Sequence, residues 1–278
     1  MKGLFYIDGE NALTRYSLSI AEGGYNGLVS FPTLKKFDIN DWDDQNGVEP
    51  DLSELHFDSR EISIKFNGES ISGTMEFVDK LTTGVYHQFR FEDLGITLNM
   101  RLESQPALNT MKELHIFSLK FIVDASPLKD YTYEAPQGKA IDTGYALDAL
   151  DFAKYGIKVL WGSDKEILKV PAIKKNCQVN SDTIDGSLYY AGEVFYAAKD
   201  VSLSLLMQVP TMDIFWRNWK ALLYNLTQPE GRILKYDFEN YAAFYKSGQT
   251  KEFHIDSEGH IWWKFNLVLC FYDFRINP

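Results

Sequence analysis

Residues 60–66 read REISIKF, and residues 199–205 read KDVSLSL, which repeats the same pattern 139 positions later. In both stretches a basic and an acidic residue precede apolar residues at every second position. This period of two places Ile62, Ile64 and Phe66 on one face of a strand. The repetition of a whole strand predicts that the chain contains two copies of one fold.

Working outward from these strands, single residues recur at the same offset. Tyr16, Pro32, Lys35, Lys36, Gly47, Glu54 and Ser63 return in order as Tyr155, Pro171, Lys174, Lys175, Gly186, Glu193 and Ser202. Near the end of each copy, the strand residues Phe117, Leu119 and Phe121 correspond to Phe265, Leu267 and Leu269. Matches in this order along most of the chain indicate an internal duplication.

Each copy contains one amphipathic helix. Thr74 and Thr211 are each followed by an acidic residue and an apolar run, so we expect both to cap the start of a helix. After the helix the offset rises to 147, where Phe89 matches Tyr236. This shift predicts that the second helix is longer by about ten residues, or roughly three turns of about 3.6 residues each.

Length and composition favour two β-rich domains. The chain has 278 residues, of which 45% are hydrophobic and 15% aromatic, enough for two cores of about 120 to 140 residues each. The predicted fold class is β-rich α+β, with two related β-sandwich or barrel modules that each carry one packed helix, longer in the second copy. The expected boundaries are residues 1–124 for the first module, 125–146 for a linker with proline, glycine and polar residues, and 147–278 for the second, duplicated module.

The charge and the cysteines limit the classes of partner. A formal net charge of -11 argues against tight binding of nucleic acid or anionic lipid, because affinity for phosphates comes largely from clustered Lys and Arg. Cys177 and Cys270 provide no disulfide framework, and Cys270 lies in an apolar strand where a buried free thiol is the ordinary interpretation. Neither a secretory signal nor an apolar stretch of roughly 20 residues is evident, so we expect a soluble chain made in the cytosol.

No motif predicts an enzyme or a metal site. Residues 41–47 resemble a calcium loop, but the register places Trp42 and Ser53 where acidic ligands are required. His254 and His260 flank a hairpin turn and lack an evident third ligand. The sequence has no nucleophile elbow, no phosphate-binding glycine loop and no Cys and His nucleophile pair. We therefore expect neither catalysis nor a cofactor.

Eight residues are the candidate interface positions: Lys35, Lys36, Arg60, Lys174, Lys175, Lys199, Trp262 and Trp263. The lysine pairs recur in both copies, and they either contact DNA phosphates or an acidic neighbouring subunit, or lie at solvated strand ends. Arg60 and Lys199 begin equivalent strands, where ion pairs within or between subunits are open to them. The adjacent tryptophans point to opposite faces of one strand, so we expect at least one to be exposed or at an interface.

Residues 41–66 resemble the N-terminal region of phage distal tail proteins. That family typically has a turn with glycine and acidic residues, a short spacer, an aromatic residue, an arginine and an alternating strand. Gly47, Phe57, Arg60 and residues 62–66 occupy these places. The second copy offers a corresponding set, which consists of Gly186, Tyr196, Lys199 and residues 201–205.

This resemblance implies a role in assembly. In the family, the N-terminal module is a β-sandwich with a helix that forms a hexameric ring around the tail lumen and joins the tail tube to the tip or baseplate. Here the second half resembles another ring module instead of a peripheral domain, which leaves two stoichiometries open. Either six chains form the ring with the second modules stacked or outside, or three chains form a pseudo-sixfold ring, as in baseplate hub proteins of contractile-tailed phages.

The resemblance implies a structural phage or prophage tail protein, located in the virion tail and assembled in the bacterial cytoplasm. Its partners would be copies of itself, the tail tube, and tail-tip or baseplate proteins, without sequence-specific nucleic acid binding or membrane insertion. The alternative function is a soluble carbohydrate-binding or adhesion β-sandwich. That alternative predicts an open aromatic groove lined by Trp42, Trp161 and either Trp262 or Trp263.

Overall fold

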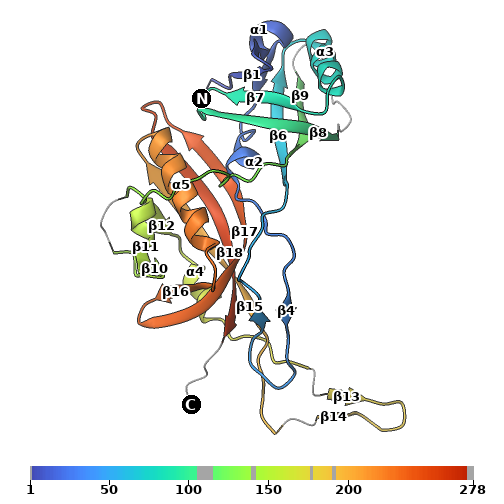
Figure 1. Ribbon diagram of the computed structural model, residues 1–278, viewed down its shortest axis with the longest axis vertical. Coiled ribbons are helices and arrows are strands. Elements are labelled where there is room, and N and C mark those ends of the chain that lie inside the picture. The colour runs from blue at the N-terminus through green and yellow to red at the C-terminus, as the bar shows by residue number, and fades with distance from the viewer. Residues whose placement is uncertain (1, 105–114, 139–141, 176–177, 190–191, 274–278) are drawn as a thin grey trace.

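Two curled antiparallel sheets of seven strands each lie one beyond the other along the long axis of the molecule (Figure 1). The computed structural model describes residues 2–104, 115–138, 142–175, 178–189 and 192–273. The first sheet has the order β2 (Glu10–Asn11), β1 (Phe5–Ile7), β7 (His87–Phe91), β8 (Ile96–Ser104), β9 (His115–Val123), β6 (Arg60–Gly68) and β3 (Leu18–Ile20). The second has the order β11 (Leu150–Asp151), β10 (Tyr145–Leu147), β16 (Arg232–Tyr236), β17 (Glu239–Ile255), β18 (Ile261–Asp273), β15 (Lys199–Val209) and β12 (Ile157–Val159).

The two orders are the same, strand for strand, when the elements are counted along the chain. We call residues 5–123, from β1 to β9, the first repeat, and residues 145–273, from β10 to β18, the second repeat. The prediction of a β-rich chain with two similar modules is thereby confirmed. The domain boundaries remain a prediction, and β10 begins at Tyr145, inside the segment expected as a linker.

Alternation of side chains explains why the central strands are stable. In β6 every second side chain is buried, and Ile62, Ile64 and Phe66 are completely covered. Their counterparts in β15 are equally buried, as period two requires for a strand with one face on a core. A single cluster of buried apolar side chains runs through both repeats, so the two cores are in contact.

One helix packs across each sheet. The remaining helices are short: α1 (Ala12–Tyr16), α2 (Asn26–Val29), α4 (Ser163–Leu168) and the 3-10 helix η1 (Phe152–Tyr155). The packed helices are α3 (Ile71–Thr82), with 12 residues, and α5 (Met212–Leu226), with 15 residues. The second helix is longer, as predicted, but by three residues and not by ten.

The expected cap of the first packed helix is wrong. Ser70 is the N-cap of α3, and its side chain accepts a hydrogen bond from the backbone N–H of Gly73. Thr74 lies one turn further on, where its hydroxyl donates to the carbonyl oxygen of Ser70 and contacts His115. Thr211 is the N-cap of α5, as predicted. The local pattern misled because a Thr before an acidic residue occurs both at a cap and one turn inside a helix.

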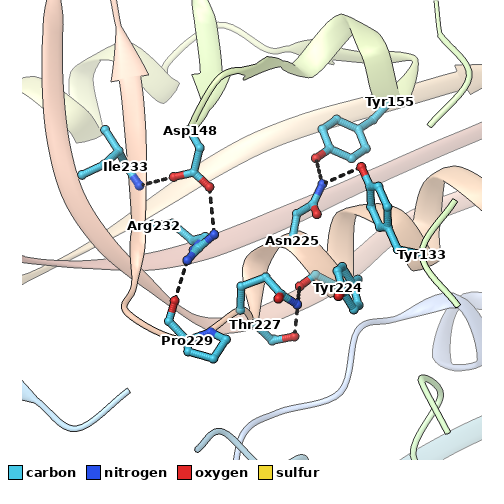
Figure 2. A network of polar contacts seen from close by, with 10 residues as sticks. Tyr133, Asp148, Tyr155, Tyr224, Asn225, Thr227, Pro229, Arg232 and Ile233 are labelled. Carbon is cyan, nitrogen blue, oxygen red and sulfur yellow. Dashed lines mark hydrogen bonds and ion pairs between the residues drawn. The ribbon is translucent and has the colours of Figure 1, made fainter. Parts of the chain in front are cut away.

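The register after the helices also differs from the sequence alignment. Asp8 and Asp148 occupy equivalent left-handed turns. Asp8 accepts a backbone hydrogen bond from Gln88. Asp148 accepts the corresponding hydrogen bond from Ile233, which Figure 2 shows. Gln88 therefore corresponds to Ile233, so the offset is 145 and Phe89 corresponds to Leu234 instead of Tyr236. A slip of two residues is invisible to alternation, because it returns every side chain to the same face.

Two long arms leave the sheets. The first arm, residues 32–58, contains β4 (Ile39–Asn40) paired with β5 (Glu49–Pro50). The second arm, residues 171–197, contains β13 (Gln178–Asn180) paired with β14 (Ser187–Tyr189). Both arms run toward the same end of the molecule, and the β13–β14 hairpin projects away from both sheets (Figure 1). Within the described residues, no helix is long and apolar enough to cross a membrane.

Candidate assembly surface

The first repeat docks on the second through the residue that follows α2. Phe31 leaves the first repeat and is buried in the core of the second, where its ring centroid lies 4.8 Å from that of Trp219 and 5.3 Å from that of Trp263. Its backbone N–H donates to the carbonyl oxygen of Gly248. A Cβ at Gly248 would lie 2.5 Å from the Phe31 ring, so only glycine allows this approach.

Hydrogen bonds fix the chain on both sides of Phe31. The indole N–H of Trp219 donates to the carbonyl oxygen of Val29 at 2.8 Å, and the hydroxyl of Tyr245 donates to that of Pro32 at 2.5 Å. The N–H of Thr250 donates to the hydroxyl of Ser30. Hydrogen-bond donors buried in the second repeat pair with the backbone of the first repeat. They stabilise one relative position of the two repeats, because leaving buried polar groups unpaired is costly.

A turn of the first repeat provides a second contact. The turn between β7 and β8 buries Leu94, and the indole N–H of Trp216 on α5 donates to the Leu94 carbonyl oxygen at 2.7 Å. The first repeat therefore meets the α5 side of the second repeat through two elements. These are the end of α2 together with the segment that follows it, which include Val29 and Phe31, and the β7–β8 turn.

The corresponding elements of the second repeat are exposed. Val170 holds the place of Phe31 at the offset of 139 and is 73% exposed, and Leu168 holds the place of Val29 and is 61% exposed. The turn between β16 and β17 corresponds to the β7–β8 turn, and its Phe238 is 95% exposed. Leu168, Val170 and Phe238 are thus exposed apolar side chains on elements whose counterparts in the first repeat make the junction.

Arg60 and Lys199 perform the same structural task. The buried Arg60 guanidinium donates to the carbonyl oxygen of Leu28 at 2.8 Å, near the end of α2. Lys199 donates to the carbonyl oxygens of Glu166 and Ile167, at the end of α4. A cation at the C-terminal end of a helix satisfies free carbonyl groups and complements the helix dipole.

Burial is the main influence on both cations. It lowers the pKa of Arg60 to about 10, and it also lowers the pKa of Lys199. The acidic neighbours instead pair elsewhere, Glu61 with Lys120 and Asp200 with Lys246. Within one chain, Arg60 and Lys199 thus hold α2 against β6 and α4 against β15.

Lys174 joins the two arms. Its side chain is buried, and Nζ lies 2.5 Å from a carboxylate oxygen of Asp41 and 2.7 Å from the carbonyl oxygen of Trp42. Asn46 and Gly47 of the first arm also exchange hydrogen bonds with the backbone of Tyr196 in the second. The arms consequently form one connected structure.

The other three candidate lysines are exposed. Lys35 and Lys36 line a cavity of about 740 Å³ between the first arm and the outer face of β17 and β18, together with Lys246, Asp200 and other residues. On the same outer face, Phe37 and Leu52 of the first arm pack with Phe244 and Cys270. Lys175 is exposed on the second arm. The lysine pairs are therefore at equivalent sequence positions but in different surroundings.

The tryptophans occupy separate surfaces. Trp263 is fully buried, with its indole N–H donating to the hydroxyl of Thr250, whereas the adjacent Trp262 is 44% exposed on the outer face of β18. Trp42 lies on the first arm and Trp161 precedes α4. Three cavities among the described residues are lined by at most one tryptophan each, which is Trp262 in the smallest of the three. These three cavities do not join Trp42, Trp161 and Trp262 into the groove that the carbohydrate-binding alternative predicts.

The histidines and cysteines have structural surroundings. No group of three metal-ligating side chains occurs among the residues that the structure describes. His260 contacts Asp256 within the hairpin turn, and His254 lies on the paired strand β17. Cys270 is buried, and burial raises the pKa of its thiol to about 12. Cys177 lies outside the described residues.

The sequence interpretation missed the residues that make the junction, Phe31, Leu94, Trp216 and Trp219. A signal was available for Phe31, since it precedes the matched Pro32 just as Val170 precedes Pro171. Both residues are apolar at a place where the chain leaves its own sheet. The signal was weak because the first residue is an aromatic side chain and the second a smaller aliphatic one.

Comparison with known proteins gives no assignment. No family profile matches the chain, and no curated protein matches it. One similar solved structure is the Dit protein of phage SPP1, described as a hub of the adsorption apparatus in phages that infect Gram-positive bacteria. The likeness covers 98% of this chain and 99% of that chain, with 8% sequence identity and a TM-score of 0.33. A likeness of this strength establishes neither the fold nor the function.

Proposed function

We propose that the protein is a structural component of a phage or prophage tail, which assembles with copies of itself into a ring at the distal end of the tail tube. In this position it connects the tube to tip or baseplate proteins and leaves a passage for DNA. The sequence resemblance of residues 41–66 supports the choice of a tail protein. The structure supports the assembly role independently.

One observation carries the assembly role. The chain consists of two repeats with the same strand order, and the first repeat docks on the second through elements whose counterparts in the second repeat are exposed. In a head-to-tail series each unit docks on the next one, and the last unit leaves the same docking elements exposed. Such contacts close into a ring when the rotation between units permits it.

The charge of the chain agrees with a passage for DNA. A net charge of -11 disfavours tight retention of DNA phosphates, because such retention depends largely on clustered Lys and Arg. We expect the wall of the lumen to be acidic, so that it repels DNA and does not retain it. An inner wall lined by basic residues would contradict this part of the proposal.

The mass of the purified protein in solution tests the proposal directly. Light scattering coupled to chromatography, or sedimentation, would be measured over a concentration series. A closed trimer or hexamer is expected, and averaged electron micrographs of that species should show a ring with a central opening. A protein that remains a monomer at about 100 µM, or one that forms an open and unlimited polymer, would count against a ring.

A further inference from the structure

We propose that the exposed surface of the second repeat, formed by Leu168, Val170 and Phe238, docks on the first repeat of a second copy of this chain. The contact would have the arrangement that joins the two repeats within one chain. The inference rests on the proposed function, because it names the contact by which the ring would close. It selects a head-to-tail contact over a stack of separate layers.

The donor side of the proposed contact, meaning the surface of the second repeat with Leu168, Val170 and Phe238, follows from the contact within one chain. Phe31 and Leu94 are fully or almost fully buried and both contact the second repeat, whereas Val170, which takes the place of Phe31, is 73% exposed. Phe238 lies in the turn that corresponds to the turn of Leu94, and it is 95% exposed. Both exposed residues lie on counterparts of the elements that make the internal junction, Val170 in the segment after α4 and Phe238 in the β16–β17 turn. Two independent elements thus predict the same docking direction.

The acceptor side, meaning the surface of the first repeat that would receive the second repeat of another copy, can be located through helix positions and strand pairing. Trp219 is the eighth residue of α5 and Trp216 the fifth, and the same positions of α3 are held by Val78 and Met75. On the sheet, Phe265 pairs with Leu205 of β15 as Phe117 pairs with Phe66 of β6. Phe117 therefore corresponds to Phe265.

The acceptor is apolar and partly accessible. Met75 is 58% exposed, although it lies on the helix that covers the first sheet, and Leu102, which takes the place of Tyr245, is half-buried. A partner turn that approaches Met75, as the β7–β8 turn approaches Trp216, would explain this exposure. In the proposed contact, the β16–β17 turn with its exposed Phe238 would face Met75.

The contact between chains would be weaker than the contact within a chain. In the internal junction, the side chains of Trp219, Trp216 and Tyr245 donate hydrogen bonds to backbone oxygens of the first repeat. Met75 and Leu102 offer apolar surface in place of Trp216 and Tyr245, the place of Trp219 is held by the buried Val78, and none of these three side chains has a hydrogen-bond donor. The association should therefore depend mainly on burial of apolar area, change little with salt, and be reversible on dilution.

The head-to-tail contact also decides between the two stoichiometries. Each chain would supply two successive units to one ring, first repeat and then second. If the ring has the six units implied by the proposed function, it contains three chains. A hexamer with the second repeats outside the ring would leave the surface of Val170 and Phe238 without this role.

Single aspartate substitutions test the contact. Val170→Asp and Phe238→Asp on the donor side, and Met75→Asp on the acceptor side, each place a charge in the proposed apolar contact. All three side chains are largely exposed in the single chain, so the fold should be retained, as circular dichroism and the unfolding midpoint would show. We expect each variant to raise the dissociation constant of the oligomer by at least about 100-fold.

Trp161→Asp is the matched control. Trp161 is 86% exposed, yet its counterpart at the offset of 139, Glu22, is exposed and outside the internal junction. The control should keep the wild-type mass. An equimolar mixture of Val170→Asp and Met75→Asp should form dimers, because the intact donor of one chain can still bind the intact acceptor of the other.

The outcomes separate this inference from the proposed function. A wild-type protein that stays monomeric would overturn the ring and the contact together. A ring that forms equally well with Val170→Asp and Phe238→Asp would overturn the contact and leave the ring standing. A control variant that dissociates as much as the test variants would also overturn the contact, because the effect would then not depend on position.

Discussion

At the scale of single residues, equivalent sequence positions can have unequal structural roles. Gly47 and Gly186 are matched in the repeat, and both have a positive φ, +71° and +81°. A Cβ at Gly47 would lie 1.7 Å from the carbonyl oxygen of Tyr272, whereas a Cβ at Gly186 would meet no atom within 4 Å. Gly47 is needed both for its backbone conformation and for the close approach of the first arm to β18.

Substitution of these glycines should therefore have different effects. Gly47→Ala is expected to lower the free energy of unfolding by about 3 kcal/mol or more, because the methyl group forces the arm away from β18. Gly186→Ala should cost only about 1 kcal/mol, the strain of a left-handed alanine. Denaturant unfolding of the two variants would measure the difference, and equal losses would contradict the role assigned to Gly47.

The paired cations show the opposite case, in which unlike residues have one role. Arg60 and Lys199 each bind carbonyl groups at the end of a short helix, α2 or α4. The sequence alignment matched them by charge and by their place at the start of a strand. Their partners are backbone oxygens and not the carboxylates beside them, which charge order alone did not indicate.

At the scale of elements, the segments after α2 and α4 have the same place in their repeats but different surroundings. Phe31 fills a space between α5 and the long strands β17 and β18, with 17 and 13 residues. Val170 holds the equivalent place in the second repeat, and it is exposed and fills no such space.

Truncation of the two equivalent side chains should separate a docked element from an exposed one. Phe31→Ala is expected to lower the free energy of unfolding by about 3 to 5 kcal/mol, because it leaves a cavity between the two repeats. Val170→Ala should change it by no more than about 0.5 kcal/mol in the monomer. Unfolding curves at a concentration below that of self-association provide the test. A mild effect of Phe31→Ala would mean that the repeats are held together mainly elsewhere.

At the scale of the whole molecule, buried tyrosines connect distant parts of the chain. The hydroxyl of Tyr245 reaches Pro32 across the junction, and the hydroxyl of Tyr25 donates to Asp93. Burial raises the pKa of both phenols, and it raises the pKa of Tyr16 to about 12. The fold therefore favours the protonated phenol at several places.

Stability should consequently fall at alkaline pH. A phenol whose pKa is raised by folding contributes stability that is fully present below its ordinary pKa near 10 and is lost as the pH rises through the folded-state value. The lowered pKa of Arg60, about 10, acts in the opposite direction, but it is one group against several tyrosines. We expect the free energy of unfolding to decrease between pH 10 and pH 12.

Tyr245→Phe offers the check on this pH dependence. The variant should be about 1 to 2 kcal/mol less stable at pH 8, because the carbonyl oxygen of Pro32 loses its donor. Between pH 10 and pH 12 it should lose less stability than the wild type. A parallel loss in both proteins would show that Tyr245 does not contribute to the alkaline transition.

The sequence by itself determined that the chain is β-rich, that it contains two similar units, and that the second packed helix is longer. These properties follow from local rules, since alternation of side chains specifies strand faces and a repeat specifies like folds. The same rules could not fix the register after the helices, because a slip of two residues preserves alternation. They also misplaced the cap of α3 by one turn, at Thr74 instead of Ser70.

Only the tertiary structure decided how the two units meet. Phe31 and Val170 have similar local sequence, with a proline after each, yet one is buried in the other repeat and one is exposed. Burial of a side chain by a segment far away in the chain depends on the positions of Trp219, Trp263 and Gly248 together. Periodicity reports which face of its own sheet a residue occupies, and it carries no information about which surface will cover that residue.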